Sequence, residues 1–259
     1  MDNSRRRPGS QVERAAERTP QELPEEVAEL VGQVAEAPSP SWRRRLTAEF
    51  SRLTGRSGRA GWRGMRSGGR WLTSEVLAMA PRLPVRDQQR LREQFPGLGP
   101  EELADALIHG AGRAAAVVGA GAGAAMVLPL PSAPVEIAVE TLALVGIEIK
   151  LVAELHEVYG MRAPGSTSER MLAYVAAWAH RRGVVLAPAG LVVAAGSPLR
   201  RLLRRRLIAR AARGAMSLGP LLTGAIAGAA LNRIETRHLG DDVRDDLRRR
   251  SPYTAHWAG

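Results

Sequence analysis

The sequence predicts an all-α protein: a helical bundle with Gly/Ala-rich apolar helices and a flexible, basic N-terminal arm. Two observations favour this fold class. Apolar residues recur at helical spacing in several segments, and no segment shows a convincing alternation of apolar and polar residues. Three long stretches also carry no charged residue, and they span residues 114–135, 183–199 and 214–232.

Residues 1–70 are expected to form the N-terminal arm, which is largely disordered and contains one short helix. The helix is predicted from the spacing of Leu23, Val27, Leu30, Val31 and Val34. Residues 41–70 carry nine arginines and a single acid, and tryptophans interleave with them. This composition fits a segment that contacts anionic lipid or nucleic acid, and it equally fits a solvated linker.

The helical domain is expected to span residues 71–250, followed by a tail at 251–259. Pro100, with two carboxylates directly after it, predicts a helix start. An unbroken segment between Pro134 and Gly160 predicts a helix of about seven turns. Ser166 and Glu169 have the spacing of a capping box, which predicts the start of the next helix.

The helix predicted at 134–160 combines an apolar stripe with several carboxylates. We expect the carboxylates to face solvent or to pair with arginines; they are Glu136, Glu140, Glu148, Glu154 and Glu157. The alternative is that Glu136 and Glu140, which share a face of the helix, form a partly buried and functional pair next to membrane-embedded helices. A carboxylate-bridged dimetal site needs Glu-x-x-His, but Ala153 stands three residues before His156. We therefore interpret His156 as a core histidine.

Several function classes are excluded or disfavoured by the residues. The chain has no cysteine, which excludes disulfides, cysteine nucleophiles and thiolate metal sites. Gly119, Gly121 and Ala124 match a dinucleotide-binding fingerprint, but the prolines at 129, 131 and 134 and the helical surroundings do not fit its strand–turn–helix context. We predict no catalytic residue, no cofactor and no metal, and hence a protein that is not an enzyme.

The three charge-free stretches are long enough to bear on membrane insertion. A membrane-spanning helix needs about 20 apolar residues, but these stretches are rich in Ala and Gly and are interrupted by prolines. Small residues recur within them at every fourth position. We predict that Gly119, Gly123, Gly224 and Gly228 allow close helix contact, either in lipid or within a water-soluble bundle.

The segment between the second and third stretches is strongly basic. Residues 200–213 contain seven arginines and no acid. A short basic connection between apolar segments fits the positive-inside rule, which places it on the cytoplasmic side of a membrane. The residues expected to contact lipid phosphates are Arg200, Arg201, Arg204, Arg205 and Arg206.

The pattern from about Gly110 to Arg250 resembles the EcsC family of bacterial proteins. The resemblance rests on the Gly-rich run that ends in LPLPSAPVE, on the long helix that closes at Tyr159-Gly160, and on the C-terminal segment LGPLLTGAIAGAALNRIETRHLG. The family takes its name from a gene beside an ABC-type transporter. The resemblance implies a mainly helical, membrane-associated protein and supplies no catalytic residues.

Together these observations predict a non-enzymatic, membrane-associated helical protein on the cytoplasmic side, accessory to a membrane or transport complex. Its expected partners are anionic lipid and a protein of that complex. The alternative is a soluble helical module that binds nucleic acid without sequence specificity, through the arginines of residues 43–70 and 200–213.

Overall fold

The computed structural model describes residues 22–36, 70–125, 133–182, 205–206 and 223–251. Within these ranges the regular structure is entirely helical, which confirms the all-α prediction. The helices are α2 (Glu22–Glu36), α5 (Arg70–Met79), the 3₁₀ turn η1 (Ala80–Arg82), α6 (Gln88–Gln94), α7 (Pro100–Ala125), α8 (Ala133–Val158), α9 (Thr167–Arg181) and α11 (Thr223–Arg250). The remainder of the predicted arm and the tail lie outside the described residues.

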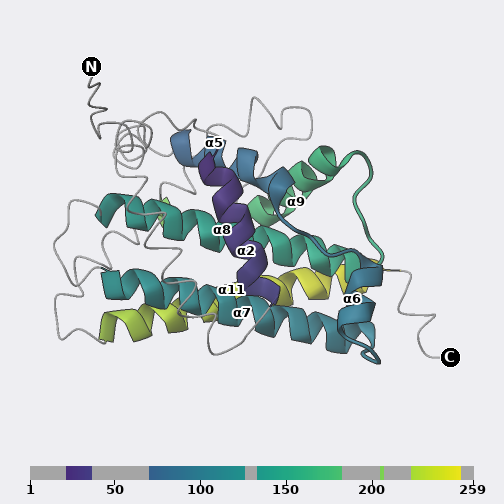
Figure 1. Cartoon of the computed structure of the whole chain (residues 1–259). Coiled ribbons are helices and arrows are strands. Elements are labelled where there is room, and N and C mark those ends of the chain that lie inside the picture. The colour runs from purple at the N-terminus through teal and green to yellow at the C-terminus, as the bar shows by residue number, and fades with distance from the viewer. Residues whose placement is uncertain (1–21, 37–69, 126–132, 183–204, 207–222, 252–259) are drawn as a thin grey trace, which may run out of the picture.

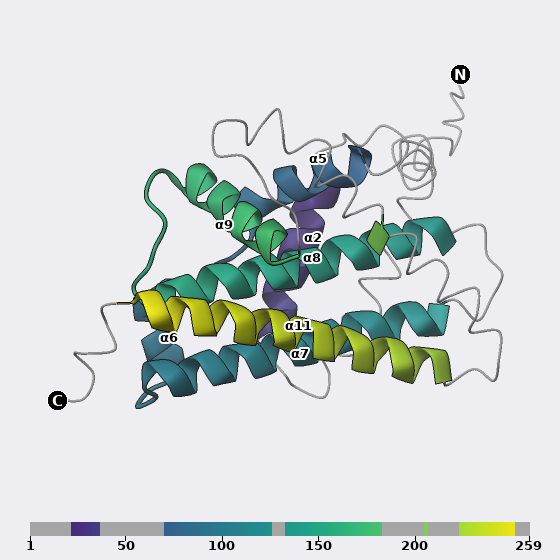
Figure 2. The same cartoon turned by 180° about the vertical axis from the view of Figure 1, so that it is seen from behind.

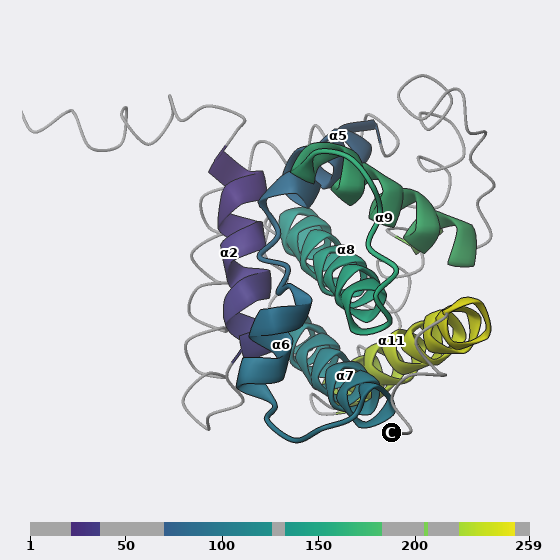
Figure 3. The same cartoon turned by 90° about the vertical axis from the view of Figure 1, so that its right-hand side faces the viewer.

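Helix α8 lies at the centre of the molecule. Figure 3 shows it nearly end-on, with α2, α5, α9, α11 and α7 around it. Every residue from Val139 to Leu155 is buried, so this helix has no solvent-facing side along that length. It ends where the sequence predicted, at Gly160, whose φ of 65° suits glycine. The Met161 N–H donates to the His156 carbonyl and the Gly160 N–H to the Glu157 carbonyl, which is the Schellman arrangement.

Helices α7 and α11 lie side by side in opposite directions (Figures 1 and 2). Three cross-helix contacts fix their register: Gly119 lies against Gly228, Asp105 pairs with Arg244, and Glu101 pairs with Arg248. Helix α8 runs parallel to α11, because Leu151 lies beside Gly240 and Tyr159 beside Ser251. The last residue of α7 and the first residues of α8 and α11 therefore lie at the same end of the bundle.

Glycines make the close approach of α7 and α11 possible. A Cβ atom on Gly119 would lie 2.5 Å from Nδ2 of Asn232 and 3.0 Å from the carbonyl oxygen of Gly228. A Cβ atom on Gly240 would lie 2.7 Å from Ile108. Such distances leave no room for a methyl group, so the two backbones approach more closely than larger side chains would allow.

Helix α2 belongs to the packed body, although the sequence placed it in the arm that precedes residue 71. It crosses α8 and α7 (Figure 1), and its apolar side chains at Val27, Leu30 and Val31 are buried in the common core. Gly146 of α8 accommodates it, since a Cβ there would lie 2.8 Å from Val31 Cγ2. The spacing that predicted this helix is the spacing of its buried face.

Helix α9 begins with the predicted capping box. The Ser166 hydroxyl accepts a hydrogen bond from the Glu169 N–H, and the Glu169 carboxylate accepts one from the Ser166 N–H. The helix then buries Trp178 completely against the core. The capping box fixes where α9 starts, and the buried face of the helix fixes which side meets α8.

The Gly119→Ala variant tests the tight α7–α11 contact. We expect it to lower the free energy of unfolding by about 1–3 kcal/mol, because the new methyl group overlaps Asn232 and the Gly228 backbone. Gly110→Ala is the matched control on the same helix, where a Cβ meets nothing within 4 Å. The control should be neutral or stabilising by up to about 1 kcal/mol. Equal effects of the two variants in urea unfolding would contradict the packing argument.

Candidate functional site

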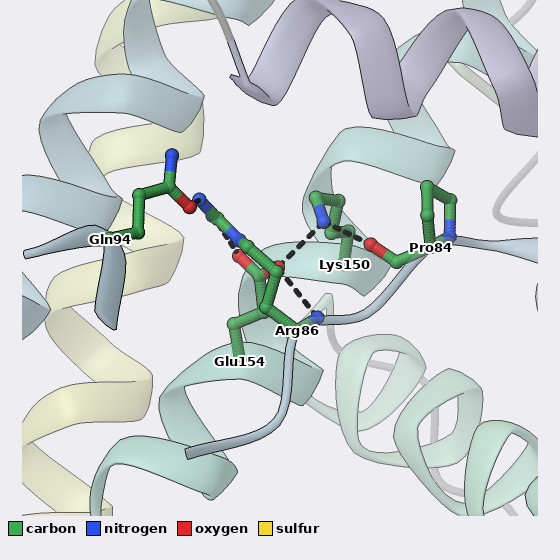
Figure 4. Close-up of polar contacts among 5 residues, drawn as sticks. All are labelled: Pro84, Arg86, Gln94, Lys150 and Glu154. Atoms are coloured by element: carbon green, nitrogen blue, oxygen red, sulfur yellow. Dashed lines mark hydrogen bonds and ion pairs between the residues drawn. The ribbon is translucent and has the colours of Figure 1, made fainter. Parts of the chain in front are cut away.

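The interior of the protein contains an ion-pair cluster around Glu154 of α8 (Figure 4). The Arg86 guanidinium donates to both carboxylate oxygens, with Nη2 2.6 Å from Oε2 and Nε 2.8 Å from Oε1. Lys150 Nζ lies 2.6 Å from Oε1, and the Arg86 backbone N–H also donates to Oε1 at 3.2 Å. All three side chains are buried.

Two segments far apart in sequence supply this cluster. Lys150 and Glu154 stand one turn apart on α8, and Arg86 comes from the connection between η1 and α6. The remaining donors are also used: Arg86 Nη1 donates to Gln94 Oε1 at 2.7 Å, and Lys150 Nζ donates to the carbonyl of Pro84. The cluster thus fastens the connection before α6 to the central helix.

The cations beside Glu154 decide its charge state. Burial by itself would raise the pKa of this carboxyl group, but the hydrogen bonds and positive charges of Arg86 and Lys150 outweigh burial. The net effect is a pKa below the ordinary value of 4.5. Glu154 is therefore an ionised structural anion in the folded protein.

A second cluster surrounds Glu148, two turns earlier on α8. Its carboxylate accepts hydrogen bonds from Trp178 Nε1 at 2.6 Å, from Arg206 Nη1 at 3.0 Å and from Arg182. The Arg206 guanidinium also lies over the Trp178 ring, 5.6 Å from its centroid. Burial raises the pKa of Glu148, but the two arginines and the indole N–H bring it below its ordinary value.

These clusters have a geometry suited to clamping rather than to proton transfer. Each carboxylate is surrounded by several donors that belong to the protein itself, and each is held ionised. A general acid or base needs a group that can exchange a proton with a substrate near the working pH. The clusters instead join α8 to the segment before α6, to α9 and to Arg206.

The carboxylates of α8 whose burial the structure describes are all buried, and Glu136 is not among them. The solvated face is wrong for Glu148 and Glu154, because both are buried; the arginine-paired alternative is confirmed for them. Glu140 and Glu157 are also buried, and Glu157 pairs with Arg162 at 3.0 Å. His156 is partly buried, and its Nδ1 lies 2.7 Å from the Val152 carbonyl.

Two of the predicted helix-packing glycines, Gly119 and Gly228, lie on the α7–α11 seam. Gly119 and Gly228 face each other, and a Cβ on Gly228 would lie 3.6 Å from the Gly119 carbonyl. Gly123 and Gly224 belong to the same two helices, one turn further along each, but their surroundings lie outside the described residues. The seam also contains buried Asn232, which continues the four-residue spacing of Gly224 and Gly228 and lies beside Gly119.

The predicted surface arginines are only partly covered by the structure. Arg200, Arg201 and Arg204 lie outside the described residues, and Arg205 is exposed. Arg206 occupies a different environment from the one expected: its side chain is 14% exposed and paired with Glu148. Arg206 thus attaches this segment to the body, whereas the side chain of Arg205 is exposed.

Arg86 and Trp178 were missed as partners of the α8 carboxylates. The signal was present in the sequence, because Glu148, Lys150 and Glu154 interrupt an otherwise apolar helix. Buried charges need partners, so their presence predicts that arginines from elsewhere reach this helix. Which arginines do so depends on the tertiary arrangement.

No helix among the described residues has the length and apolar character needed to cross a membrane. The described residues also contain no group of three or more His, Asp or Glu side chains placed to hold a metal ion. Comparisons with family models, curated proteins and solved structures find no match to this chain.

Glu154→Gln tests the first cluster. We expect it to destabilise the protein by about 3–5 kcal/mol at neutral pH, because Arg86 and Lys150 stay buried without their anion. The lowered pKa of Glu154 means that its stabilisation is present above pH 4.5 and is lost as the pH falls through the folded-state value. The difference from wild type should shrink accordingly in urea titrations below pH 4. The exposed Glu93→Gln serves as control, and an equal effect would refute the clamp.

Glu75 of α5 provides a second titration with the opposite sign. Its side chain is buried, its Oε2 has no hydrogen-bond partner among the described residues, and burial raises its pKa to about 7. Folding therefore becomes less favourable as the pH rises from 4.5 to 7, since the folded state resists ionisation. We expect Glu75→Gln to stabilise the protein by about 2 kcal/mol at pH 8 and by little at pH 4.5. A gain that is equal at both pH values would contradict this account.

Proposed function

We propose that the protein is a non-enzymatic, membrane-associated helical protein that lies on the cytoplasmic face of an anionic membrane, with one end of its bundle in the lipid. The observation that carries the proposal is the polarity of the α7–α11 helix pair along its length; α8, which begins at the same end, carries Glu136 and Glu140. In α7 the residues from 114 to 125 carry no charge, and in α11 neither do those from 223 to 232. Because the two helices are antiparallel, these parts lie at the same end.

The opposite end of the same helices is rich in charge. Glu101 and Asp105 of α7 meet Arg248 and Arg244 of α11 there, and α11 continues to Arg250 with charged residues at most positions. A helix pair in water has no need to separate its charges in this way. A helix pair that meets lipid at one end does, since charged groups are costly in hydrocarbon.

The length of the charge-free end supports entry into one leaflet. A helix rises about 1.5 Å per residue, so the stretch from 114 to 125 is about 18 Å long. The hydrocarbon core of a bilayer is about 30 Å thick. The end of the bundle would therefore reach to about the middle of the membrane, and the arginine-rich segment 200–213 would remain at the headgroups.

The ion clusters of α8 support a structural role for the body of the protein. Its two central carboxylates are occupied by arginine, lysine and tryptophan side chains from the same chain. The resemblance to the EcsC family adds to the proposal a role as an accessory to a membrane or transport complex. Nucleic-acid binding through the arginine-rich segments is the outcome to be separated from it by experiment.

Leu231→Glu tests the proposal on the exposed face of α11, where Leu231 is 37% and Ile234 51% exposed. The wild-type protein should float with vesicles that contain phosphatidylglycerol. The variant should bind them about tenfold more weakly, because a carboxylate replaces an apolar side chain at the lipid-facing end. His238→Glu is the matched control, two helical turns further along the same exposed face, and should retain most of the binding.

Three results would count against the proposal. Wild-type protein that stays at the bottom of the gradient with anionic vesicles would contradict membrane association. Equal losses in Leu231→Glu and His238→Glu would show that charge alone matters. Tight binding to duplex DNA with a steep salt dependence, in the absence of vesicle binding, would favour the nucleic-acid alternative.

A further inference from the structure

The seam between α7 and α11 carries facing polar side chains, one for each turn in the first half of α7. The α7 members stand four residues apart and therefore share one face of the helix. They are Glu101, Asp105, His109 and Arg113. The facing residues on α11 are Arg248, Arg244, Arg237 and Arg233, in the reverse order that an antiparallel pair requires.

The first two pairs are charge-balanced. Arg248 Nε lies 3.7 Å from Glu101 Oε1, and Arg244 Nη1 donates to Asp105 Oδ1. A further carboxylate, Asp241, lies 3.2 Å from Arg244 Nη2. Towards the charged end of the bundle, the arginines of α11 thus have anions supplied by the protein.

The third pair has no anion. Arg237 Nη2 lies 2.9 Å from His109 Nε2, while His109 Nδ1 lies 2.9 Å from the Asp105 carbonyl. A guanidinium can only donate and a carbonyl can only accept. The neutral ring with its proton on Nδ1 satisfies both contacts, so His109 brings no negative charge to Arg237.

One turn beyond His109 on α7 stands Arg113, and one turn before Arg237 on α11 stands Arg233. Arg113 and Arg233 are both exposed, and neither forms an ion pair with any residue that the structure describes. Gly112 brings the α11 side chains close to α7, since a Cβ there would lie 2.8 Å from Arg237 Cγ and 3.5 Å from Arg233 Cγ. Glu235 stands two residues from Arg233, and residues two apart on a helix do not face the same way.

These arginines stand where the charge-free end of the bundle begins. Arg113 directly precedes the stretch 114–135, and Arg233 directly follows the stretch 214–232. Exposed Leu231 and Ile234 of α11 flank Arg233. Uncharged stretches of α7 and α11 on one side of a boundary, and guanidinium groups at it that have no ion pair among the described residues, match the layering of a membrane, where phosphates lie above acyl chains.

We propose that Arg113, Arg233 and Arg237 bind the phosphate of an anionic phospholipid headgroup, with His109 positioning Arg237. This inference rests on the proposed membrane association and assigns it a site and a depth. A phosphate accepts hydrogen bonds from guanidinium groups in a planar, two-pronged geometry. The phosphate would supply a negative charge to Arg113, Arg233 and Arg237, as Glu101 and Asp105 supply one to Arg248 and Arg244.

The test compares two double variants of the full chain that remove the same charge. Arg113→Gln with Arg233→Gln removes the unpaired arginines, whereas Arg248→Gln with Arg249→Gln removes arginines from the charged end. Binding to vesicles of phosphatidylcholine with phosphatidylglycerol is measured by flotation across a lipid titration. We expect the affinity for the vesicles to fall about fivefold for each of Arg113 and Arg233 that is replaced, about 25-fold in total. The control should lose less than about twofold in affinity.

The possible outcomes separate this site from the proposed function. If wild type binds the vesicles and both double variants lose binding equally, the membrane association stands and the site is refuted. If neither variant loses binding, the site is also refuted. If the Arg113→Gln, Arg233→Gln variant binds vesicles like wild type but loses affinity for duplex DNA, these arginines bind nucleic acid instead. Circular dichroism and thermal melting verify that both variants are folded, as expected for exposed positions.

Discussion

The burial of α8 is the constraint on which the rest of the structure depends. This helix has neighbours on every side, yet it carries Glu148, Lys150 and Glu154 in its buried length. An ionised carboxylate without partners in such a place costs several kcal/mol. The surrounding elements are therefore selected by charge as well as by shape: the connection before α6 must supply Arg86, and the end of α9 must supply Trp178 and Arg182. Apolar packing alone would leave α8 free to rotate or slide, whereas these pairs fix its position.

Position 150, in the Glu154 cluster, is occupied by lysine rather than arginine, and the limited space there explains why. Among 37 basic residues, Lys150 is the only lysine, and it lies at the centre of the Glu154 cluster. Its ammonium group reaches the Glu154 carboxylate one turn away and the carbonyl of Pro84. Arg86 already occupies the two-pronged position on the same carboxylate. A second guanidinium there is larger, planar and rigid, while a compact ammonium fits beside the first. Among the described residues, arginines pair with carboxylates in the interior and at the surface, and lysine stands at this crowded point.

The sequence predicted what local patterns determine and missed what tertiary packing determines. The helix starts at Pro100 and Ser166 and the end at Gly160 depend on caps within a few residues, and all three were predictable. The apolar stripe on α8 was also visible, but the sequence could not show that its polar side is covered too. That depends on α2, α5 and α9, whose positions no local period encodes. Arg206 likewise reads as one of several surface arginines, and only the fold shows that Glu148 and Trp178 hold it. The spacing of Gly119 and Gly228 indicated close helix contact but not that Asn232 fills the space between them.

The same ion pairs bear on how such a fold could meet a membrane without losing its structure. A bundle held together only by apolar contacts would be weakened in lipid, because hydrocarbon competes for the same surfaces. In this protein the position of α8 is fixed by charged groups at residues 148–154, whereas the uncharged parts of α7 and α11 lie at the end where α8 begins with Glu136 and Glu140. The α7–α11 seam is held at that end by glycine packing, which needs no hydrophobic effect, and at the other end by Glu101, Asp105 and their arginines. Neither the ion pairs of α8 nor the contacts between α7 and α11 depend on water at the apolar end. Contact of that end with acyl chains would therefore leave the body intact, and the unpaired arginines at the boundary would set how deeply it enters.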